Sequence, residues 1–365
     1  MTFDYAARRE RLAGLLPAHE VQALLVTAPE NVRYLTGLAS SNAAVLVRAD
    51  GSALLATDNR YIDVARALDV PAVEAADVAG ALASVLEEPR TGIEAASMSV
   101  ATYHHLGHHL GHHLGHRPGH RPGEALVPLG PVAEGLRTVK DDAELALLRT
   151  ACELTDQAFD DVRQRIAPGM TERDLARLLD NRMTELGADR PAFDTIVAAG
   201  ENGAIPHHAP TGRELRAGDL VTMDFGARYR GYHADMTRTV CLGPPAAWQR
   251  ELYDLVVAAQ RAGRHALAPG APAGDVDAAA RSVIADAGHA EHFRHGLGHG
   301  VGLQIHEEPF LGPSRTGRLE DRVPITVEPG VYLPGRGGVR IEDTLVTREG
   351  GPELFTKTTK ELLVL

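Results

Sequence analysis

The segment DLVTMDFGARYRGYHADMTRTV, residues 219–240, has the pattern of two β-strands joined by a tight turn. If Tyr229 and Arg230 form the tip of the turn, Asp224 lies directly opposite Asp235 on one face of the sheet. Two carboxylates in directly opposed positions repel each other, at a cost of up to ~1 kcal/mol even where they are exposed. The pattern therefore predicts a positive charge between Asp224 and Asp235.

A second segment, PITVEPGVYLPGRGGVRIEDTLVT (residues 324–347), repeats this layout of strand, glycine-rich turn and strand. Its centre lies near Gly335, and Glu328 and Glu342 are placed symmetrically about that centre, so they can also meet. In both segments the first strand carries acid-x-Gly and the second carries an acid two residues before a threonine. This echo predicts two half-domains related by duplication, each of which donates two carboxylates to a common centre.

Between the two hairpins lies HGLGHGVGLQIHEEP, residues 295–309, in which every second residue from 296 to 302 is glycine. Each glycine costs a helix about 1 kcal/mol relative to alanine, so we expect an extended or looped segment whose backbone approaches another group closely. The segment does not complete a dinucleotide-binding G-x-G-x-x-G motif, and Phe310 replaces the second histidine of H-E-x-x-H. No phosphate-binding loop motif occurs in the chain.

The four carboxylates, together with one histidine of the segment between the hairpins, would form an oxygen-rich set of metal ligands. Such a set suits hard or borderline divalent ions such as Mn²⁺ or Co²⁺ better than it suits a structural Zn²⁺. Two ions ~3.5–4 Å apart can share carboxylates, hold a water molecule as hydroxide and polarise a carbonyl group. The set therefore predicts a hydrolase centre.

The region before the hairpins predicts a separate α/β domain over residues 1–130. Residues 23–28 and 43–57 read as strands, the second range turning at Asp50 and Gly51. YAARRERLAGLL and RYIDVARAL have helical spacing. We expect a second, larger α+β domain over residues 131–365.

The second domain is predicted to begin with two helices. The first runs from about residue 141 to 165. The second has Thr171 as N-cap, Asp174 in the capping-box position and Gly187 at its end. The apolar side of the first helix comprises Leu145, Leu148, Cys152, Thr155 and Phe159.

Composition narrows the class of protein. The 365 residues are 44% hydrophobic and carry a net charge of −12, which opposes binding to nucleic acid or an anionic membrane. Two cysteines, Cys152 and Cys241, cannot form a disulfide framework, so we expect a cytoplasmic protein. The N-terminal residues lack the apolar run of a signal peptide, and no window approaches ~18 apolar residues, so no membrane segment is expected.

A histidine-rich repeat occupies residues 104–120, with the unit Gly-His-His-Leu. Such close repetition is typical of recent slippage expansion, whereas a metal site needs different residues at different places. Leu106, Leu110 and Leu114 stay roughly on one side of a helix. We therefore expect a helix or surface loop lengthened by repeats, whose metal binding in vitro says little about function. A nickel or zinc store is the alternative.

The motifs MDFGARYRGYHADMTRT, HGLGHGVGLQIHEEP, VEPGVY and GVRIED resemble those of the pita-bread metallopeptidases, which include methionine aminopeptidase, aminopeptidase P and Xaa-Pro dipeptidase (prolidase). ALLVTAPENVRYLTGL resembles the creatinase-type N-terminal domain, which methionine aminopeptidases lack. The resemblance covers nearly the whole chain except the histidine repeat. It implies a pita-bread catalytic domain behind a smaller creatinase-type α/β domain, and it indicates the proline-directed branch.

The resemblance also implies a ligand set for two divalent metal ions per subunit. Asp224 and Asp235 would bind one ion, Asp235 and Glu342 would bridge, and His299 and Glu328 would complete the other site. Glu328 would also relay a proton from the bridging water to the leaving amine. Manganese is the expected metal, with cobalt or zinc as alternatives.

Further residues are implied to bind substrate. His207 matches the substrate-binding histidine of the family, and His208 is the weaker candidate. His306 would hydrogen-bond the scissile carbonyl or its gem-diolate, and His295 would line the proline pocket. Arg340, two residues before Glu342 and therefore on the same strand face, would brace the bridging acids. Pro324 departs from the family pattern and fits a strand start, which leaves the ligands intact.

The resulting expectation is an enzyme, a homodimer, that hydrolyses the Xaa-Pro bond of dipeptides by means of a hydroxide bridging two metal ions. Its partners would be small peptides with proline at the second position. An aminopeptidase P that releases the first residue of Xaa-Pro-Xaa peptides is the alternative, because the catalytic motifs do not separate the two. Creatinase has the same fold but works without metal ions and lacks these ligands. The intact ligand set therefore argues against creatinase activity. A non-catalytic binding protein on this fold is the distant alternative.

Overall fold

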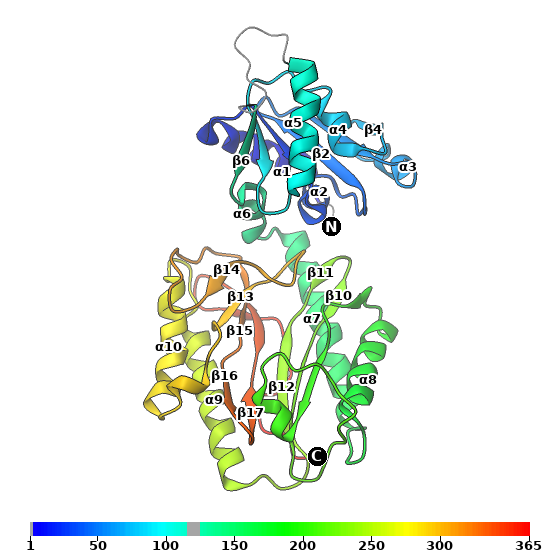
Figure 1. Ribbon diagram of the computed structural model, residues 1–365. Helices are drawn as coiled ribbons and strands as arrows, with labels where there is room; N and C mark the ends of the chain where they lie inside the picture. The colour runs from blue at the N-terminus through cyan, green and yellow to red at the C-terminus, as the bar shows by residue number, and fades with distance from the viewer. Residues whose placement is uncertain (1–2, 115–124) are drawn as a thin grey trace. The chain divides into compact units, whose positions relative to one another are not determined.

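The computed structural model describes residues 3–114 and 125–365 (Figure 1). The chain divides into two compact units, Met1–Arg137 and Thr138–Leu365. The first unit is an α/β domain and the second combines helices with antiparallel sheets, which is the fold class expected from the sequence. Among the described residues no helix is both long and apolar enough to cross a membrane.

The N-terminal unit is built on one six-stranded sheet with the order β4-β3-β2-β1-β5-β6. Its strands β1 to β3 pair antiparallel and the outer pairs are parallel. The strands are β1 Ala23–Val26, β2 Ala43–Arg48, β3 Ala53–Thr57, β4 Ala72–Glu74, β5 Thr91–Glu94 and β6 Leu126–Leu129. The helices are α1 Tyr5–Leu15, α2 Pro29–Thr36, α3 Ile62–Ala65, α4 Val78–Ala83, α5 Val100–Leu114 and α6 Val132–Thr138, with a 3₁₀ turn at Leu16–His19.

Two local predictions in this unit have different outcomes. The turn at Gly51, whose φ is 86°, joins β2 to β3 as expected. The helix expected in RYIDVARAL is reduced to the four residues of α3. The first part of the histidine repeat is helical, as α5, and buries Leu106 and Leu110. Its remainder, from residue 115, lies outside the described residues.

The C-terminal unit contains four long helices and several antiparallel sheets. The helices are α7 Asp142–Arg163, α8 Glu172–Glu185, α9 Ala247–Ala266 and α10 Ala273–Asp286, with 3₁₀ turns at Gly200–Ala204 and Ala290–His292. The first group of strands is β7 Arg190–Pro191, β8 Ile196–Ala199, β9 Leu220–Phe225, β10 Ala227–Tyr229, β11 Tyr232–His233 and β12 Met236–Cys241. The second group is β13 Gly298–Gly300, β14 Glu307–Leu311, β15 Pro324–Val327, β16 Gly330–Leu333, β17 Gly337–Arg340, β18 Asp343–Val346 and β19 Glu353–Leu354.

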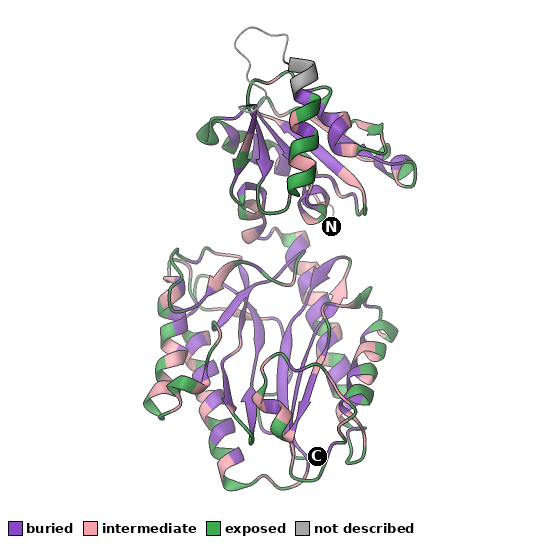
Figure 2. Ribbon diagram, viewed as in Figure 1, coloured by how far each residue is buried: buried purple, intermediate pink, exposed green. Residues whose placement is uncertain are grey.

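The two halves of this unit share one plan, as the echo between the hairpins predicts. Helices α7 and α8 precede the sheet β12-β9-β8, and α9 and α10 precede a sheet that contains β13-β15-β18. In Figure 1 each helix pair covers the outside of its own strands, and a separate hydrophobic core lies beneath each pair. The strands that carry the predicted carboxylates occupy the space between the two helix pairs, where Figure 2 shows almost continuous burial.

The helices of the first half begin and end where the sequence places them. Thr171 caps α8 and forms a capping box with Asp174, and Gly187, with φ 109°, follows the end of that helix. Asp141 caps α7 in the same way. The five predicted apolar positions of α7 are all buried: Leu145, Leu148, Cys152, Thr155 and Phe159.

Candidate metal centre

The first hairpin differs from its predicted register. Asp224 pairs with Thr237, and Asp235 lies two residues before that position. The tip falls one residue later than predicted, at Arg230 and Gly231, which both have positive φ (46° and 81°), as a type I′ turn requires. Because side chains alternate between faces with a period of two, Asp224 and Asp235 still lie on the same face.

The second hairpin has the predicted register. Gly330 pairs with Arg340 in the two-stranded sheet and Val327 pairs with Asp343 in the larger one, a symmetry centred on Gly335. Glu328 and Glu342 occupy the positions where the chain passes from one sheet to the other. Both carboxylates are therefore held between two paired segments.

The threonines of the acid-x-Thr echo tie the two hairpins together. Thr237 Oγ1 donates a hydrogen bond of 2.7 Å to Glu342 Oε2, and Thr344 Oγ1 donates one of 2.8 Å to the carbonyl of Asp235. The amide of Glu342 also donates to the Thr237 carbonyl at 3.1 Å. Each threonine thus holds the acid of the other hairpin, a reciprocity that the sequence repeat did not reveal.

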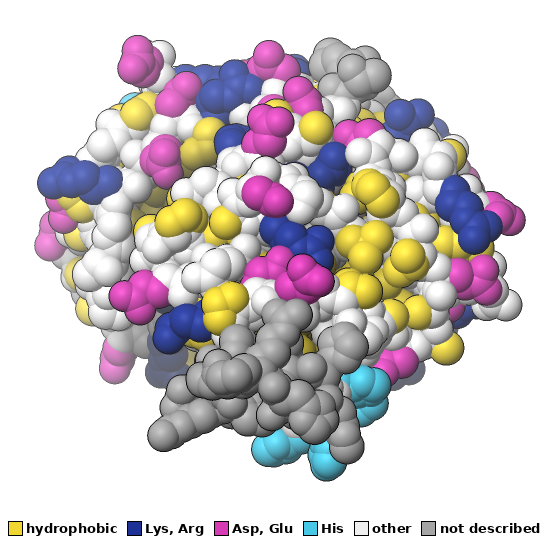
Figure 3. Space-filling model, turned by 90° about the horizontal axis from the view of Figure 1, so that it is seen from above, with side chains coloured by type: hydrophobic (Ala, Val, Ile, Leu, Met, Phe, Trp, Pro, Cys, Tyr) yellow, Lys and Arg dark blue, Asp and Glu magenta, His cyan; other side chains and the backbone are white. Residues whose placement is uncertain are grey.

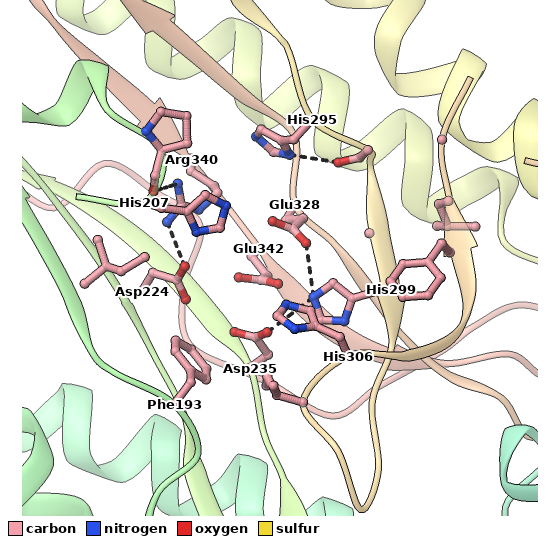
Figure 4. A pocket seen from close by; sticks show the side chains of 18 of the residues that line it. Phe193, His207, Asp224, Asp235, His295, His299, His306, Glu328, Arg340 and Glu342 are labelled. Atoms are coloured by element: carbon pink, nitrogen blue, oxygen red, sulfur yellow. Dashed lines mark hydrogen bonds and ion pairs between the residues drawn. The ribbon is translucent and has the colours of Figure 1, made fainter. Parts of the chain in front are cut away.

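The four carboxylates and His299 converge on one point (Figure 4). His299 Nε2 lies 3.6 Å from Asp235 Oδ2 and 3.4 Å from Glu328 Oε1. One oxygen each of Asp224, Asp235 and Glu342 is buried without a hydrogen-bond partner in the described part of the chain. Buried polar atoms of this kind are costly unless something satisfies them, and a divalent cation fits carboxylate oxygens combined with one imidazole nitrogen.

Without a bound cation, the carboxylates of this cluster place unfavourable negative charges close together in a buried site. Burial, together with the neighbouring carboxylates, raises the pKa of Asp235 and of Glu342 well above their ordinary values. Burial also raises the pKa of Glu328 to about 8. Burial lowers the pKa of His299 to about 4, so its imidazole is neutral and keeps a lone pair for a metal ion.

Arg340 brings a positive charge to Asp224, one of the two acids between which a positive charge was expected. Its Nη2 lies 2.7 Å from Asp224 Oδ2, and its Nε donates to Thr237 Oγ1 at 3.1 Å. The guanidinium therefore contacts Asp224 directly and reaches Glu342 only through Thr237. Its Nη1 also donates to the Pro206 carbonyl, which fixes the backbone just before His207.

A polar chain leads from Arg340 to His295. Arg340 Nη1 donates to the Tyr332 hydroxyl at 2.9 Å, and that hydroxyl lies 2.9 Å from His295 Nε2. The other ring nitrogen of His295 faces the Gly296 carbonyl at 2.8 Å, so it must be the protonated one and Nε2 the acceptor. His295 thus lines the pocket and also makes structural hydrogen bonds. Sequence reasoning missed Tyr332, although Tyr332 shares a strand face with Gly330, the pairing partner of Arg340.

His207 and His306 line the same cavity, of about 500 Å³, with their side chains accessible from outside. The ring of His306 packs edge-on against that of His299, with centroids 4.4 Å apart. His208 points elsewhere: it is buried, and its Nε2 lies 2.9 Å from Glu172 Oε2. The structure therefore brings all nine residues predicted for this site to one pocket: His207, Asp224, Asp235, His295, His299, His306, Glu328, Arg340 and Glu342.

Glu172 holds the loop that carries His207. Its fully buried carboxylate accepts hydrogen bonds from the amide of Ala199, from Asn202 Nδ2, and from both the amide and the hydroxyl of Thr211. Although burial opposes its charge, these hydrogen bonds lower the pKa of Glu172 to about 2. No local signal in the sequence marks this role, because the contacts reach up to 39 residues along the chain.

The rim of the cavity carries groups that the sequence did not single out. Phe193 and Asp194 line it from the first half, and Phe310 and Arg315 from the second. The Arg315 guanidinium lies 4.9 Å from the centre of the Phe310 ring. Arg315 and Arg340 are the two arginines that line the cavity. Among the described residues no carboxylate forms an ion pair with Arg315, so its guanidinium can bind an anionic group of a ligand.

Comparison with known proteins identifies a family for each of the two units. Residues 146–349 match the model of metallopeptidase family M24, and residues 8–139 match that of the creatinase/prolidase N-terminal domain. The Xaa-Pro dipeptidase of Pyrococcus furiosus is 33% identical over 358 residues, which are 98% of this chain and 99% of that protein.

Solved structures similar to this chain include both kinds of proline-directed peptidase. An Xaa-Pro dipeptidase from Bacillus anthracis superposes with a TM-score of 0.92 at 32% identity, covering 99% of this chain and 100% of that one. An X-Pro aminopeptidase from Thermotoga maritima superposes with a TM-score of 0.87 at 31% identity, covering 98% and 100%.

Proposed function

Because the chain belongs to metallopeptidase family M24, we propose that this peptidase hydrolyses the Xaa-Pro bond of dipeptides. The observation that carries the proposal is the convergence of four acids and four histidines of predicted function on one cavity. The relatives named Xaa-Pro dipeptidase support this substrate class.

Two divalent ions are proposed to bind among the carboxylates. Asp224 and Asp235 would hold one ion and His299 and Glu328 the other, with Asp235 and Glu342 available as shared ligands. The unpartnered oxygens of Asp224, Asp235 and Glu342 support this assignment. Bound there, the ions would polarise the scissile carbonyl and activate a water molecule.

The protein's own groups position the substrate. His207 and His306 face the cavity and can donate hydrogen bonds to the peptide carbonyl as negative charge develops on its oxygen. His295, fixed by Tyr332, lines the wall proposed to receive the proline ring. Glu328 is 17% exposed at its side chain, so it can take a proton from the attacking water and pass it to the leaving nitrogen.

Arg315 favours a dipeptide over a longer substrate. A dipeptide presents a free carboxylate beyond the proline ring, and a guanidinium at the rim can bind that group through charge-assisted hydrogen bonds. A longer peptide has an amide there instead. The alternative is aminopeptidase P activity, which the similarity to the Thermotoga maritima enzyme supports.

The remaining features are proposed on the strength of the family. Manganese suits this oxygen-rich donor set, with cobalt or zinc as alternatives. A homodimer in the cytoplasm completes the proposal, and two buried free cysteines, Cys152 and Cys241, accord with a reducing compartment.

The deciding experiment is a side-by-side assay of Leu-Pro and Ala-Pro-Ala in Mn²⁺ and again after chelation. We expect metal-dependent cleavage of the dipeptide alone. Cleavage of the tripeptide would replace the proposal with aminopeptidase P, and metal-dependent cleavage of neither would overturn the assignment to proline peptides. Undiminished cleavage after complete metal removal would overturn the metal mechanism.

A further inference from the structure

A second group of metal-ligating side chains lies in the N-terminal unit. His105 and His109 stand one turn apart on α5, and Asp77 precedes α4. Potential ligand atoms of the three residues all lie within 4.8 Å of one another. We propose that Asp77, His105 and His109 form a binding site for a borderline divalent cation such as Zn²⁺ or Ni²⁺, distinct from the carboxylate-rich centre.

The geometry of Asp77 is fixed by its neighbours. As the N-cap of α4 it accepts a 3.0 Å hydrogen bond from the Gly80 amide on Oδ1, which leaves Oδ2 to face His105 Nε2 at 2.6 Å. A Cβ atom at position 80 would lie 2.1 Å from Oδ2. Glycine at this position therefore provides the space that the carboxylate occupies.

The packing of α5 fixes the direction of the two histidines. Leu106 and Leu110 are fully buried in the core that they share with Leu82 of α4. Burial of these leucines sets the rotation of the helix, so His105 and His109 emerge on its exposed side, with ring centroids 4.6 Å apart. Figure 3 shows exposed histidine side chains grouped at one edge of the face it displays.

The ligand chemistry distinguishes this site from the catalytic one. Two imidazoles and one carboxylate, with open positions for water, suit zinc, nickel, cobalt or copper, whereas an oxygen-rich set suits manganese. Histidines four residues apart on a helix are a recurrent zinc-binding spacing. The repeat alone provides that spacing, and Asp77 adds a ligand from the N-cap of α4, so that a bound ion would link α4 to α5.

The test compares full-length variants by Zn²⁺ titration and by thermal unfolding with and without Zn²⁺. D77N is the informative variant, because it keeps every histidine of the repeat and asparagine caps a helix as well as aspartate does. We expect D77N to weaken the site by at least about tenfold, a loss that even outer partners of metal sites can cause, and to reduce the rise in unfolding temperature caused by Zn²⁺, leaving only the part due to the carboxylate-rich centre. H105N should behave likewise.

H104N is the matched control, since His104 is exposed on the same helix and lies outside the cluster. It should bind Zn²⁺ as the unaltered protein does, and all variants retain the same catalytic centre. Equal Zn²⁺ affinity and equal stabilisation in D77N and the unaltered protein would overturn the proposal, because the histidines would then bind adventitiously. Loss of affinity in H104N to the same degree would overturn it as well.

Discussion

Arg340 Nη2 and Asp224 Oδ2 form an ion pair of 2.7 Å in which the arginine side chain is only 4% exposed. The same guanidinium also holds Tyr332, Thr237 and the Pro206 carbonyl. Arg340 therefore connects one predicted metal ligand, the other hairpin and the backbone before His207, and a single substitution should disturb all three.

Replacing Arg340 should be costly for both stability and activity. R340M leaves Asp224 without its cation, and breaking a buried pair in this way costs about 3–5 kcal/mol. R340K keeps a charge but cannot span the same partners with a point-like ammonium, so it should recover only part of the loss. Urea unfolding and the Leu-Pro assay measure both effects.

The control is R336M on the same hairpin, where Arg336 lies 4.4 Å over the Trp248 ring, outside the cavity. Activity in R340M close to that of R336M would contradict the role given to Arg340.

D235N should not destabilise the metal-free protein, but it should abolish the activity of the metal-loaded protein. Asp235 is buried beside Glu342 and Asp224, whose charges oppose its ionisation. Removing its charge should leave the metal-free protein as stable or more stable, whereas turnover in Mn²⁺ should be lost with the shared ligand. Thermal unfolding in chelator and the peptidase assay test this. D286N, an exposed acid on α10, is the control, and retained turnover in D235N would refute the proposed ligand set.

The metal-free protein should lose stability as pH rises above neutrality. The pKa of Glu328 is about 8 in the fold against 4.5 for the free side chain, and those of Asp235 and Glu342 are also raised. A raised carboxyl pKa contributes stability that is complete below the unfolded pKa and is lost as pH rises through the folded pKa. Metal binding should remove the loss, because cations favour the ionised carboxylates.

Buried histidines make the free energy of unfolding increase with pH, but only below pH 6.5. Burial lowers the pKa of His295 and of His299 from 6.5 to about 4, so their contribution grows with pH up to 6.5 and is constant above it. Between about pH 7 and pH 8.5 the histidines therefore contribute no change in stability. The loss of stability in this range comes from the buried carboxyl groups, which still release protons. Unfolding temperatures in chelator across this range test it, and E328Q should reduce the slope. A flat or rising curve would contradict the prediction.

Glu172 should matter for catalysis although it lies outside the cavity. E172Q replaces one acceptor oxygen with a donor, so the amides of Ala199 and Thr211 and the side chain of His208 cannot all remain satisfied. We expect kcat/KM to fall by up to about 10²-fold, the effect of a displacement of about 1 Å in a positioned group, with metal content unchanged. Hydrogen exchange at the two amides should become faster.

The matched variant is D174N, which weakens the capping box of the same helix without touching the loop. If D174N and E172Q lost equal activity, general destabilisation of α8 would explain both and the positioning role would be wrong.

Arg315 should control the preference for a free carboxylate. A charge-assisted hydrogen bond contributes about 1.5–3 kcal/mol, so R315A should raise KM for Leu-Pro by about 10- to 150-fold and leave that for Leu-Pro amide nearly unchanged. R318A, which removes an exposed arginine bound to the Gly270 carbonyl, is the control. Equal effects on both substrates would contradict carboxylate recognition.

The hairpins show how far local sequence determines this centre. The register around Gly335 could be predicted because the glycine-rich turn lies midway between two acids. The other tip was misplaced by one residue because Arg230, a residue that rarely adopts positive φ, does so here. The face of Asp224 and Asp235 was nevertheless right, because the resulting shift of two residues preserves alternation.

Residues whose roles depend on distant contacts could not be found in this way. Glu172 was recognisable only as part of a helix start, since its partners lie on a loop that begins 27 residues later. The roles of Tyr332 and Arg315 depend on the folded cavity, which places them beside residues that are distant in the sequence. Asp77 likewise acquires its neighbour His105 through the packing of α4 against α5.

The paired strands make the centre far less tolerant of insertions than of substitutions over evolutionary time. One residue added within β9 before Asp224 would turn that acid to the opposite face and separate it from its partners. Residues 334–336, at the far end of the second hairpin, can change in number without this effect. The Gly-His-His-Leu repeat lies in the other unit, where added residues would leave the register of both hairpins intact.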